Sequence, residues 1–162
     1  MITTIAITGV FAYFVVHWAK FDGMGTEEDF YLNSQTGGTI DLVGLLLGGM
    51  IIGLLGVLYD AAIGQAVAIE ELHHVAPHLP KRIIFARAIR IGREHIGALV
   101  NTLAIAYVGV SLPLLLLFTV STTLPLVQII NQQIFSTEII RTLVGSIGLV
   151  LAVPITTALS VW

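Results

Sequence analysis

The sequence predicts an all-α protein, a polytopic transmembrane helix bundle of about four spans that forms a single transmembrane domain over residues 1–162. Apolar residues make up 56% of the chain and charged residues only 10%, whereas soluble domains carry about 25% charged residues. Four apolar runs have the roughly 20 residues that a helix needs to cross a bilayer. We therefore expect the lipid bilayer to surround most of the chain, and we expect neither a soluble enzyme nor a nucleic-acid partner.

The first predicted span covers residues 2–19 and ends beside Trp18, an aromatic residue typical of the membrane interface. No positively charged segment precedes this run and no small-residue cleavage site follows it, so we expect a span and not a signal peptide. Residues 20–40 follow as a polar, acidic outer loop, in which Gly37 and Gly38 break regular structure.

The second predicted span covers residues 41–66, and its helical pattern continues to about Leu72. The last part of this pattern is amphipathic and is expected to emerge into water, where Pro77 and Pro80 break the helix. Residues 73–95 then form a basic loop between the second and third spans.

Two more spans are predicted at residues 96–120 and 139–162, and Pro113 lies near the far end of the third. The loop between them, residues 121–138, contains no Lys or Arg. Its moderately apolar stretch PLVQIINQQIF is expected to lie flat in the membrane interface.

The basic residues predict the orientation of the bundle. Five of the seven Lys and Arg residues lie between the second and third spans, namely Lys81, Arg82, Arg87, Arg90 and Arg93. Because Lys and Arg concentrate in cytoplasmic loops, this loop is predicted to be cytoplasmic. An even number of spans then places both the N- and the C-terminus in the cytoplasm, and the loops 20–40 and 121–138 outside.

Asp60 is the residue with the strongest functional signal, because it lies inside the apolar second span. It follows Asp41 by 19 residues, about 29 Å at 1.5 Å per residue, which places it in the inner part of the membrane. A carboxylate in the middle of a span costs about 2.5–3.5 kcal/mol on insertion. The position predicts proton or cation handling; alternatively, Asp60 marks the cytoplasmic interface or forms a hydrogen bond to a neighbouring helix.

Asn101 lies in the third span at a depth similar to that of Asp60 if the two spans are antiparallel neighbours. An Asn–Asp pair would satisfy both groups in an apolar setting. Asp60 and Asn101 are therefore candidates for an ion or proton pathway, with a purely structural hydrogen bond as the alternative.

Three charged residues are predicted to meet at the outer ends of the spans. Glu138 and Arg141 share a helix face at i, i+3 spacing, and Asp41 opens the second span at the same level. This outer charged cluster is either an interfacial ion pair that fixes helix register or an outer gate or ion entrance.

A metal site is not expected. Glu70, His74 and His78 have i, i+4, i+8 spacing, but Pro77 interrupts their helix and the stretch lies in an exposed loop. The chain contains no cysteine, so thiolate sites and disulfides are excluded. We expect no cofactor either.

Glycines at small-xxx-small spacings predict close helix packing inside the bundle or against a partner. The pattern places the second span at the centre of the bundle. The residues concerned are Gly44, Gly48, Gly49, Gly53 and Gly56 on the second span, and Gly145 and Gly148 on the fourth.

Three stretches of the chain, residues 38–63, 92–118 and 136–157, resemble the YibE/F family of bacterial multi-pass membrane proteins. The resemblance covers about residues 37–160 in order, and it implies a permease-type transporter of the bacterial cell membrane without an assigned substrate. The positions that match the family pattern are Asp41, Gly48, Gly53, Asp60, Gly92, Arg93, Asn101, Pro113, Glu138, Arg141, Gly145, Gly148 and Pro154.

Members of that family are usually longer, with additional N-terminal spans. The chain is therefore expected to be a short member, one half of a split pair or a C-terminal part, with further helices supplied by a homo-oligomer or by a partner membrane subunit. A looser resemblance to the SecD/SecF and RND transmembrane bundle, in which a helix also carries an intramembrane Asp, implies proton coupling by fold-level analogy.

Two functional hypotheses follow. The first is a membrane transporter or permease, or one subunit of it, coupled to protons or ions through Asp60. The alternative is a structural or assembly subunit of a larger membrane complex. We do not expect a membrane-embedded enzyme, because Asp60 has no second carboxylate at its depth.

Overall fold

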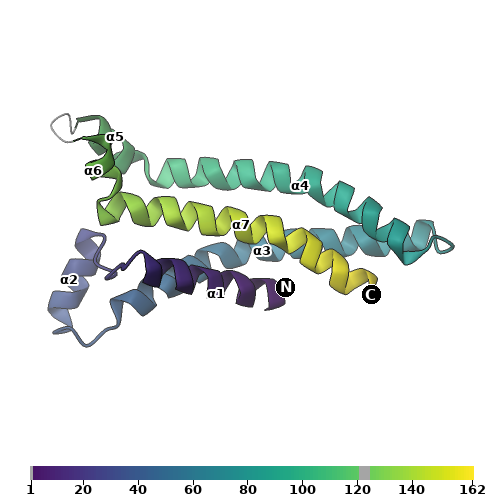
Figure 1. Cartoon of the computed structure of the whole chain (residues 1–162), viewed down its shortest axis with the longest axis horizontal. Helices are drawn as coiled ribbons and strands as arrows, with labels where there is room; N and C mark the ends of the chain where they lie inside the picture. Colours follow the sequence, from purple (N-terminus) through teal and green to yellow (C-terminus); the bar gives the residue numbers. More distant parts are fainter. Residues whose placement is uncertain (1, 121–124) are drawn as a thin grey trace.

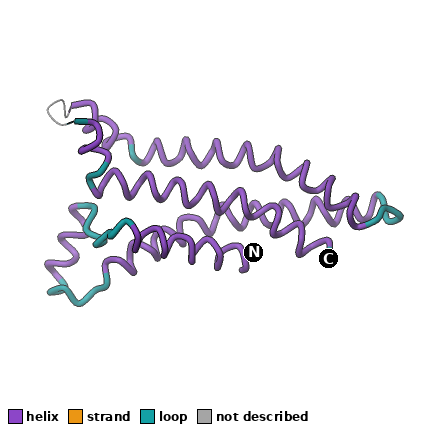
Figure 2. Tube along the Cα trace, in the orientation of Figure 1, coloured by secondary structure: helices purple, strands orange, loops and turns teal. Residues whose placement is uncertain are grey.

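The computed structural model describes residues 2–120 and 125–162, and all the regular secondary structure within them is α-helical, joined by short loops and turns (Figures 1 and 2). This confirms the all-α prediction. The described residues form α1 (Ile2–Trp18), α2 (Glu27–Gln35), α3 (Leu42–Val75), α4 (Lys81–Val110), α5 (Leu112–Val120), α6 (Leu126–Ile130) and α7 (Gln133–Val161).

Four helices, α1, α3, α4 and α7, run alongside one another as an elongated bundle (Figure 1). The short helices α2, α5 and α6 gather at one end, and the turn at 76–80 between α3 and α4 lies at the other. Both ends of the chain point away from the short helices. We call the end that carries α2, α5 and α6 the outer end, following the orientation predicted from the basic residues.

The most buried of the long helices is α7, although α3, which the glycine pattern placed at the centre, also packs against the other three long helices. α7 packs against α1, α3 and α4. In the most apolar 18-residue stretch of α7, 50% of the residues are buried within the chain. In the corresponding stretch of α3, only 22% are buried. Much of the apolar surface of α3 therefore faces outward from the chain.

Among the described residues, two helices are long and apolar enough to cross a membrane, α3 and α7, and the α4–α5 pair is a third span if it is counted as one. The sequence predicted four. The difference lies partly in α1, whose 17 residues are at the short end of the range for a span. It lies also in the predicted span 96–120, which is bent by 60° between α4 and α5.

The bend coincides with Pro113 at the start of α5. Proline has no backbone N–H, so it is tolerated in the first turn of a helix and not in its interior. The backbone N–H of Ser111 closes α4 by donating to Tyr107 O at 2.9 Å, and α5 then begins at Leu112 in a new direction.

The segment 73–95, predicted as a loop, is helical except for the turn at 76–80. α4 already begins at Lys81, and Ile84 and Ala88 are buried at a spacing of one helical turn. The four arginines of this stretch remain exposed. An amphipathic pattern of this kind extends a helix beyond the apolar region, because one face packs while the other faces water.

A buried glutamine joins α3, α4 and α7 in the half of the bundle that lies toward the turn at 76–80. Gln65 of α3 is 3% exposed, and its Nε2 donates to Ala88 O at 3.0 Å and to Thr157 Oγ1 at 2.7 Å. Both donor hydrogens of this amide are therefore satisfied by α4 and α7. Because an unsatisfied amide inside a membrane protein is costly, these bonds fix the relative register of the three helices.

Candidate functional site

The structure brings Glu138 and Arg141 together but places Asp41 in a different role. Arg141 Nη2 lies 3.5 Å from Glu138 Oε1 on α7, as the i, i+3 spacing suggested. Asp41 instead caps α3, where its Oδ1 accepts a hydrogen bond from Gly44 N at 3.0 Å. Such a cap stabilises a helix by about 1 kcal/mol. The Asp41 side chain therefore caps α3, and no ion pair with Arg141 is found for it among the described residues.

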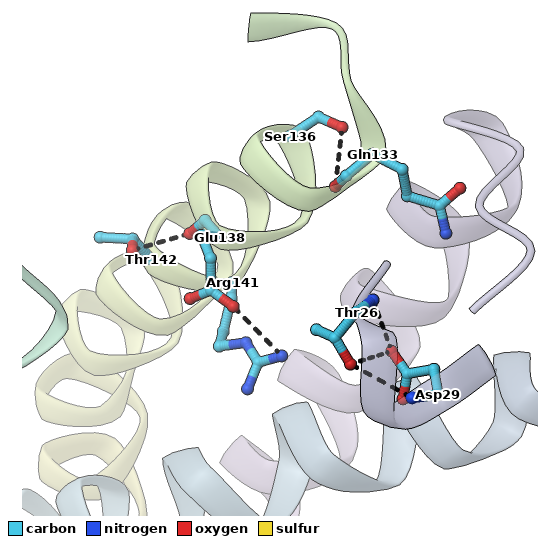
Figure 3. Close-up of polar contacts among 7 residues, drawn as sticks. All are labelled: Thr26, Asp29, Gln133, Ser136, Glu138, Arg141 and Thr142. Carbon is cyan, nitrogen blue, oxygen red and sulfur yellow. Dashed lines mark hydrogen bonds and ion pairs between the residues drawn. The ribbon is translucent and has the colours of Figure 1, made fainter. Parts of the chain in front are cut away.

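Glu138 and Arg141 lie in a cleft of about 170 Å³ at the outer end of the bundle, which we call the outer cleft. It is bounded by α2, α3, α7 and the segment that leads into α2 (Figure 3). Its lining residues are Gly23, Gly25, Thr26, Asp29, Leu45, Leu46, Gly49, Gln133, Ile134, Thr137, Glu138 and Arg141.

One wall of the outer cleft is the first turn of α2, which a capping box holds in place (Figure 3). Thr26 Oγ1 accepts a hydrogen bond from Asp29 N at 3.3 Å. In return, Asp29 Oδ2 accepts from Thr26 N at 3.0 Å and from Thr26 Oγ1 at 2.9 Å. These reciprocal bonds satisfy N–H groups that a helix start otherwise leaves free, so the position of the Asp29 carboxylate is defined.

The segment before α2 is tied to the start of α3 by Gly23. Its φ is +78°, a left-handed conformation that favours glycine. A Cβ at this position would collide with the backbone carbonyl group of Leu42. The chain therefore passes directly against the first residue of α3, which closes one edge of the outer cleft.

The same segment is tied to α7 by Asp22. Asp22 Oδ1 accepts hydrogen bonds from Gln133 Nε2 at 2.6 Å and from Met24 N at 2.9 Å. The Met24 N–H, followed by the Gln133 amide, lowers the pKa of this carboxyl below its ordinary value of 3.8, because both bonds favour the ionised form.

Replacing Asp22 by alanine is expected to lower the stability of the outer end by about 1 kcal/mol or less, since the carboxylate is exposed to solvent. A carboxyl whose pKa is lower in the folded protein stabilises it above the unfolded pKa, and this contribution is lost as the pH falls through the folded pKa. Thermal unfolding between pH 3 and 7 should therefore show a wild-type advantage that is constant well above pH 3.8 and decreases as the pH falls below about 3.8, toward the lower folded pKa. An advantage that does not decrease between pH 5 and pH 3 would contradict this assignment.

Two hydrogen-bond donors on the α7 wall have no partner within the described residues. Thr137 is 6% exposed, and its buried Oγ1 makes no hydrogen bond. The buried Nε of Arg141 also lacks an acceptor. The two residues lie at i, i+4 spacing and therefore on one helix face. Both line the outer cleft.

Asp60 and Asn101 lie at similar depths but do not meet within the described chain. A Cβ at Gly64 of α3 would lie 3.5 Å from His95 Nε2 of α4, which fixes the level at which the antiparallel helices touch. Asp60 is four residues from this level and Asn101 is six, about 6 and 9 Å toward the outer end. Both side chains are exposed on the surface of the chain, and no hydrogen bond joins them in its described part.

The glycines divide into two groups. A Cβ at Gly145 would lie 2.6 Å from Leu54 Cδ2, and one at Gly148 would lie 2.7 Å from Thr8 Cγ2, so α7 uses both for close packing. On α3, by contrast, a Cβ at four of the glycines would meet no other atom within 4 Å. A Cβ at Gly44 would meet only Asp41, the residue that caps α3. The four open positions are Gly48, Gly49, Gly53 and Gly56.

The sequence pattern of the YibE/F-like proteins matches residues 1–162, the whole chain. The chain belongs to the YibE/F-like family. No curated protein and no solved structure matches it. The match extends the resemblance from about residues 37–160 to α1 and the segment before α3. Together with its apolar helices, it identifies a YibE/F-like membrane protein.

Sequence reasoning missed the α2 side of the outer cleft of this YibE/F-like protein. Residues 20–40 were expected to be a loop, yet they contain α2 and the Asp29 carboxylate. The pattern Thr26-x-x-Asp29 was an available signal, because a hydroxyl residue followed three positions later by an acidic one is typical of a helix start. No sequence spacing indicated that this turn lies opposite Thr137 and Arg141.

Proposed function

We propose that this YibE/F-like chain is a subunit of a membrane transporter that is coupled to protons or cations through Asp60. The supporting observation is the place of Asp60 on the outward face of α3. Its neighbours on that face, one turn away on either side, are Gly56 and Ile63. A carboxylate in such surroundings is costly in lipid and is typically part of an ion or proton pathway.

The partner that would cover Asp60 is a second copy of the chain. Asp60 lies on the open face of α3 and Asn101 on the open face of α4, at nearly the same depth. A head-to-tail arrangement would set α3 of one copy against α4 of the next, so that the amide of Asn101 reaches Asp60. A symmetric contact between two α3 helices would instead oppose two Asp60 carboxylates, which repel each other.

The orientation belongs to the same proposal. The exposed arginines of α4 lie toward the turn at 76–80, and their concentration supports a location of that end in the cytoplasm of a bacterial cell. Both ends of the chain then face the cytoplasm, and the outer cleft opens toward the exterior.

Proton flux into proteoliposomes tests the role of Asp60. A pH-sensitive dye is enclosed, a membrane potential is imposed, and the wild type is compared with Asp60→Asn. We expect the proton flux with the variant to fall to that of protein-free vesicles, because an amide carries no titratable proton at neutral pH. Glu71→Gln is the matched control, since it removes an exposed carboxylate from the same helix outside the apolar stretch. Full flux in Asp60→Asn would refute the proposal.

A second candidate function is that of a structural or assembly subunit, and the open glycine face of α3 favours it. Such a face would receive a helix of a different membrane protein. This candidate predicts no flux from either protein and the co-purification of a stable partner. A homo-oligomer that carries Asp60-dependent flux would exclude it.

A further inference from the structure

We propose that the outer cleft is the binding site for a small zwitterion of amino-acid size, with its carboxylate held by Arg141 and Thr137 and its cationic group held by Glu138 and Asp29. The assignment of this molecule as the transported solute rests on the proposed transport function. The binding site itself rests on the geometry of the cleft.

The donors on α7 match a carboxylate. Thr137 contributes a buried hydroxyl, and Arg141 contributes a buried Nε–H, neither with an acceptor in the described residues. The pair between Arg141 and Glu138 is 3.5 Å long, whereas good charge-assisted hydrogen bonds are about 2.7–2.9 Å. The ion pair with Glu138 is therefore long, and the Nε–H of Arg141 has no acceptor among the described residues.

The two carboxylates of the outer cleft, Asp29 on α2 and Glu138 on α7, match a cation. Asp29 Oδ2 accepts both of the hydrogen bonds that Thr26 donates, and the other oxygen, Oδ1, accepts none within the described chain. Glu138 engages Arg141 through Oε1 alone. An ammonium group has three donors and no acceptor, so two partly free carboxylates suit it.

The balance of charge distinguishes a zwitterion from a simple ion. The outer cleft contains one positive side chain, Arg141, and two negative ones, Asp29 and Glu138. A lone anion at Arg141 would be repelled by both carboxylates, and a lone cation would leave the donors of Thr137 and Arg141 without an acceptor. A molecule with both charges satisfies both the donors and the carboxylates, because buried polar groups require partners.

The size of the outer cleft limits the molecule to few atoms. Its volume is about 170 Å³, and a cavity of about 150 Å³ holds a molecule of the size of benzene. Gly25 and Gly49 line the outer cleft with backbone atoms only. The cleft is narrow at Gly25, because a Cβ there would already lie 3.8 Å from Thr137 Oγ1. We therefore expect glycine and alanine to fit and phenylalanine to be excluded.

The outer cleft is also continuous with the face that carries Asp60. Gly49 lines the cleft, and Gly53, Gly56 and Asp60 follow it on α3 at spacings of three and four residues, which place them on one helix face. Asp60 lies 11 residues beyond Gly49, about 16 Å along the helix. A bound zwitterion would thus lie at the outer end of the face on which the coupling residue is placed.

Calorimetric titration of the full chain in nanodiscs tests the site, with glycine, acetate, methylammonium and phenylalanine as probes. We expect glycine to bind, and acetate, methylammonium and phenylalanine to bind at least about tenfold more weakly, because each loses one charged contact or does not fit. Acetate that binds as tightly as glycine, or a folded wild type that binds no glycine, would overturn the proposal.

Variants on α7 tie the binding to the outer cleft. Thr137→Val removes the unpartnered hydroxyl without changing the volume much, and we expect glycine affinity to fall about tenfold. Thr142→Val is the matched control, because its hydroxyl donates to Glu138 O at 2.9 Å and does not line the outer cleft. Equal glycine affinity in the two variants would overturn the proposal.

The outcome is separable from that of the transport experiment. Glycine binding that depends on Thr137, without flux through Asp60, would retain the binding site and refute the transporter. Asp60-dependent flux without glycine binding would retain the transporter and refute this site. Circular dichroism of each variant shows that the helices are intact.

Discussion

Replacing Gly92 by alanine is expected to destabilise the folded chain by about 1–3 kcal/mol, the usual cost of overpacking a core. Gly92 is a buried residue of α4 at the contact with α3 and α7. A Cβ there would collide with Val153 Cγ1 and would lie 2.6 Å from Gln65 Oε1. The amide of Gln65 is held by bonds to Ala88 and Thr157, so it has little freedom to move away.

Gly97→Ala is the matched control on the same helix. Gly97 is exposed, and a Cβ there would meet no atom within 4 Å. Since alanine is favoured over glycine inside a helix by about 0.5–1 kcal/mol, this variant should be slightly more stable than the wild type. Unfolding in mixed micelles of increasing SDS content, followed by circular dichroism, measures both changes. Equal stability of the two variants would show that α4 does not approach α3 and α7 as closely as the structure indicates.

The sequence predicted the membrane-protein character and the helical class correctly, because both follow from composition and from the length of apolar runs. It did not predict which helix is the most buried. Small-xxx-small patterns occur on both α3 and α7, and a pattern states only that a close approach is possible. Only the three-dimensional structure shows that Gly145 and Gly148 meet Leu54 and Thr8, while Gly53 faces outward.

The local part of the candidate site was predictable and the rest was not. The pairing of Glu138 with Arg141 follows from their positions within one helix turn. Asp29 joins them from more than a hundred residues away, and such a distance in sequence leaves no spacing signal. The outer cleft is therefore a product of the tertiary fold, namely of the Asp22–Gln133 hydrogen bond and the close passage of the segment before α2 over α3.

The largest expected effect on assembly is that of Gly53→Leu. A Cβ at Gly53 would meet no other atom of the chain within 4 Å, so the variant should fold as well as the wild type. In the proposed head-to-tail oligomer, however, its side chain would enter the contact between α3 and the α4 of the next copy. We expect self-association to weaken at least about tenfold, which corresponds to about 1.4 kcal/mol. Energy transfer between labelled copies in bicelles measures this change.

Gly148→Leu provides the opposite case. Because a Cβ at Gly148 would lie 2.7 Å from Thr8 Cγ2 inside the chain, this variant should lose α1–α7 packing and therefore fold stability. The contrast separates the two glycine groups, since one substitution should affect assembly and the other the folded chain. A Gly53→Leu variant that associates as tightly as the wild type would leave α3 facing lipid and would contradict the proposed interface.

Cysteine cross-linking then distinguishes the two possible arrangements of the copies. The natural chain contains no cysteine, so any disulfide reports only the introduced residues. Gly56 and the 64% exposed Ile105 lie on the open faces of α3 and α4 at comparable levels. When Gly56→Cys and Ile105→Cys proteins are mixed and oxidised, a head-to-tail oligomer should give mixed dimers. A symmetric contact between α3 helices would instead link Gly56→Cys to itself, and Asp60 would then face a second Asp60 and not Asn101.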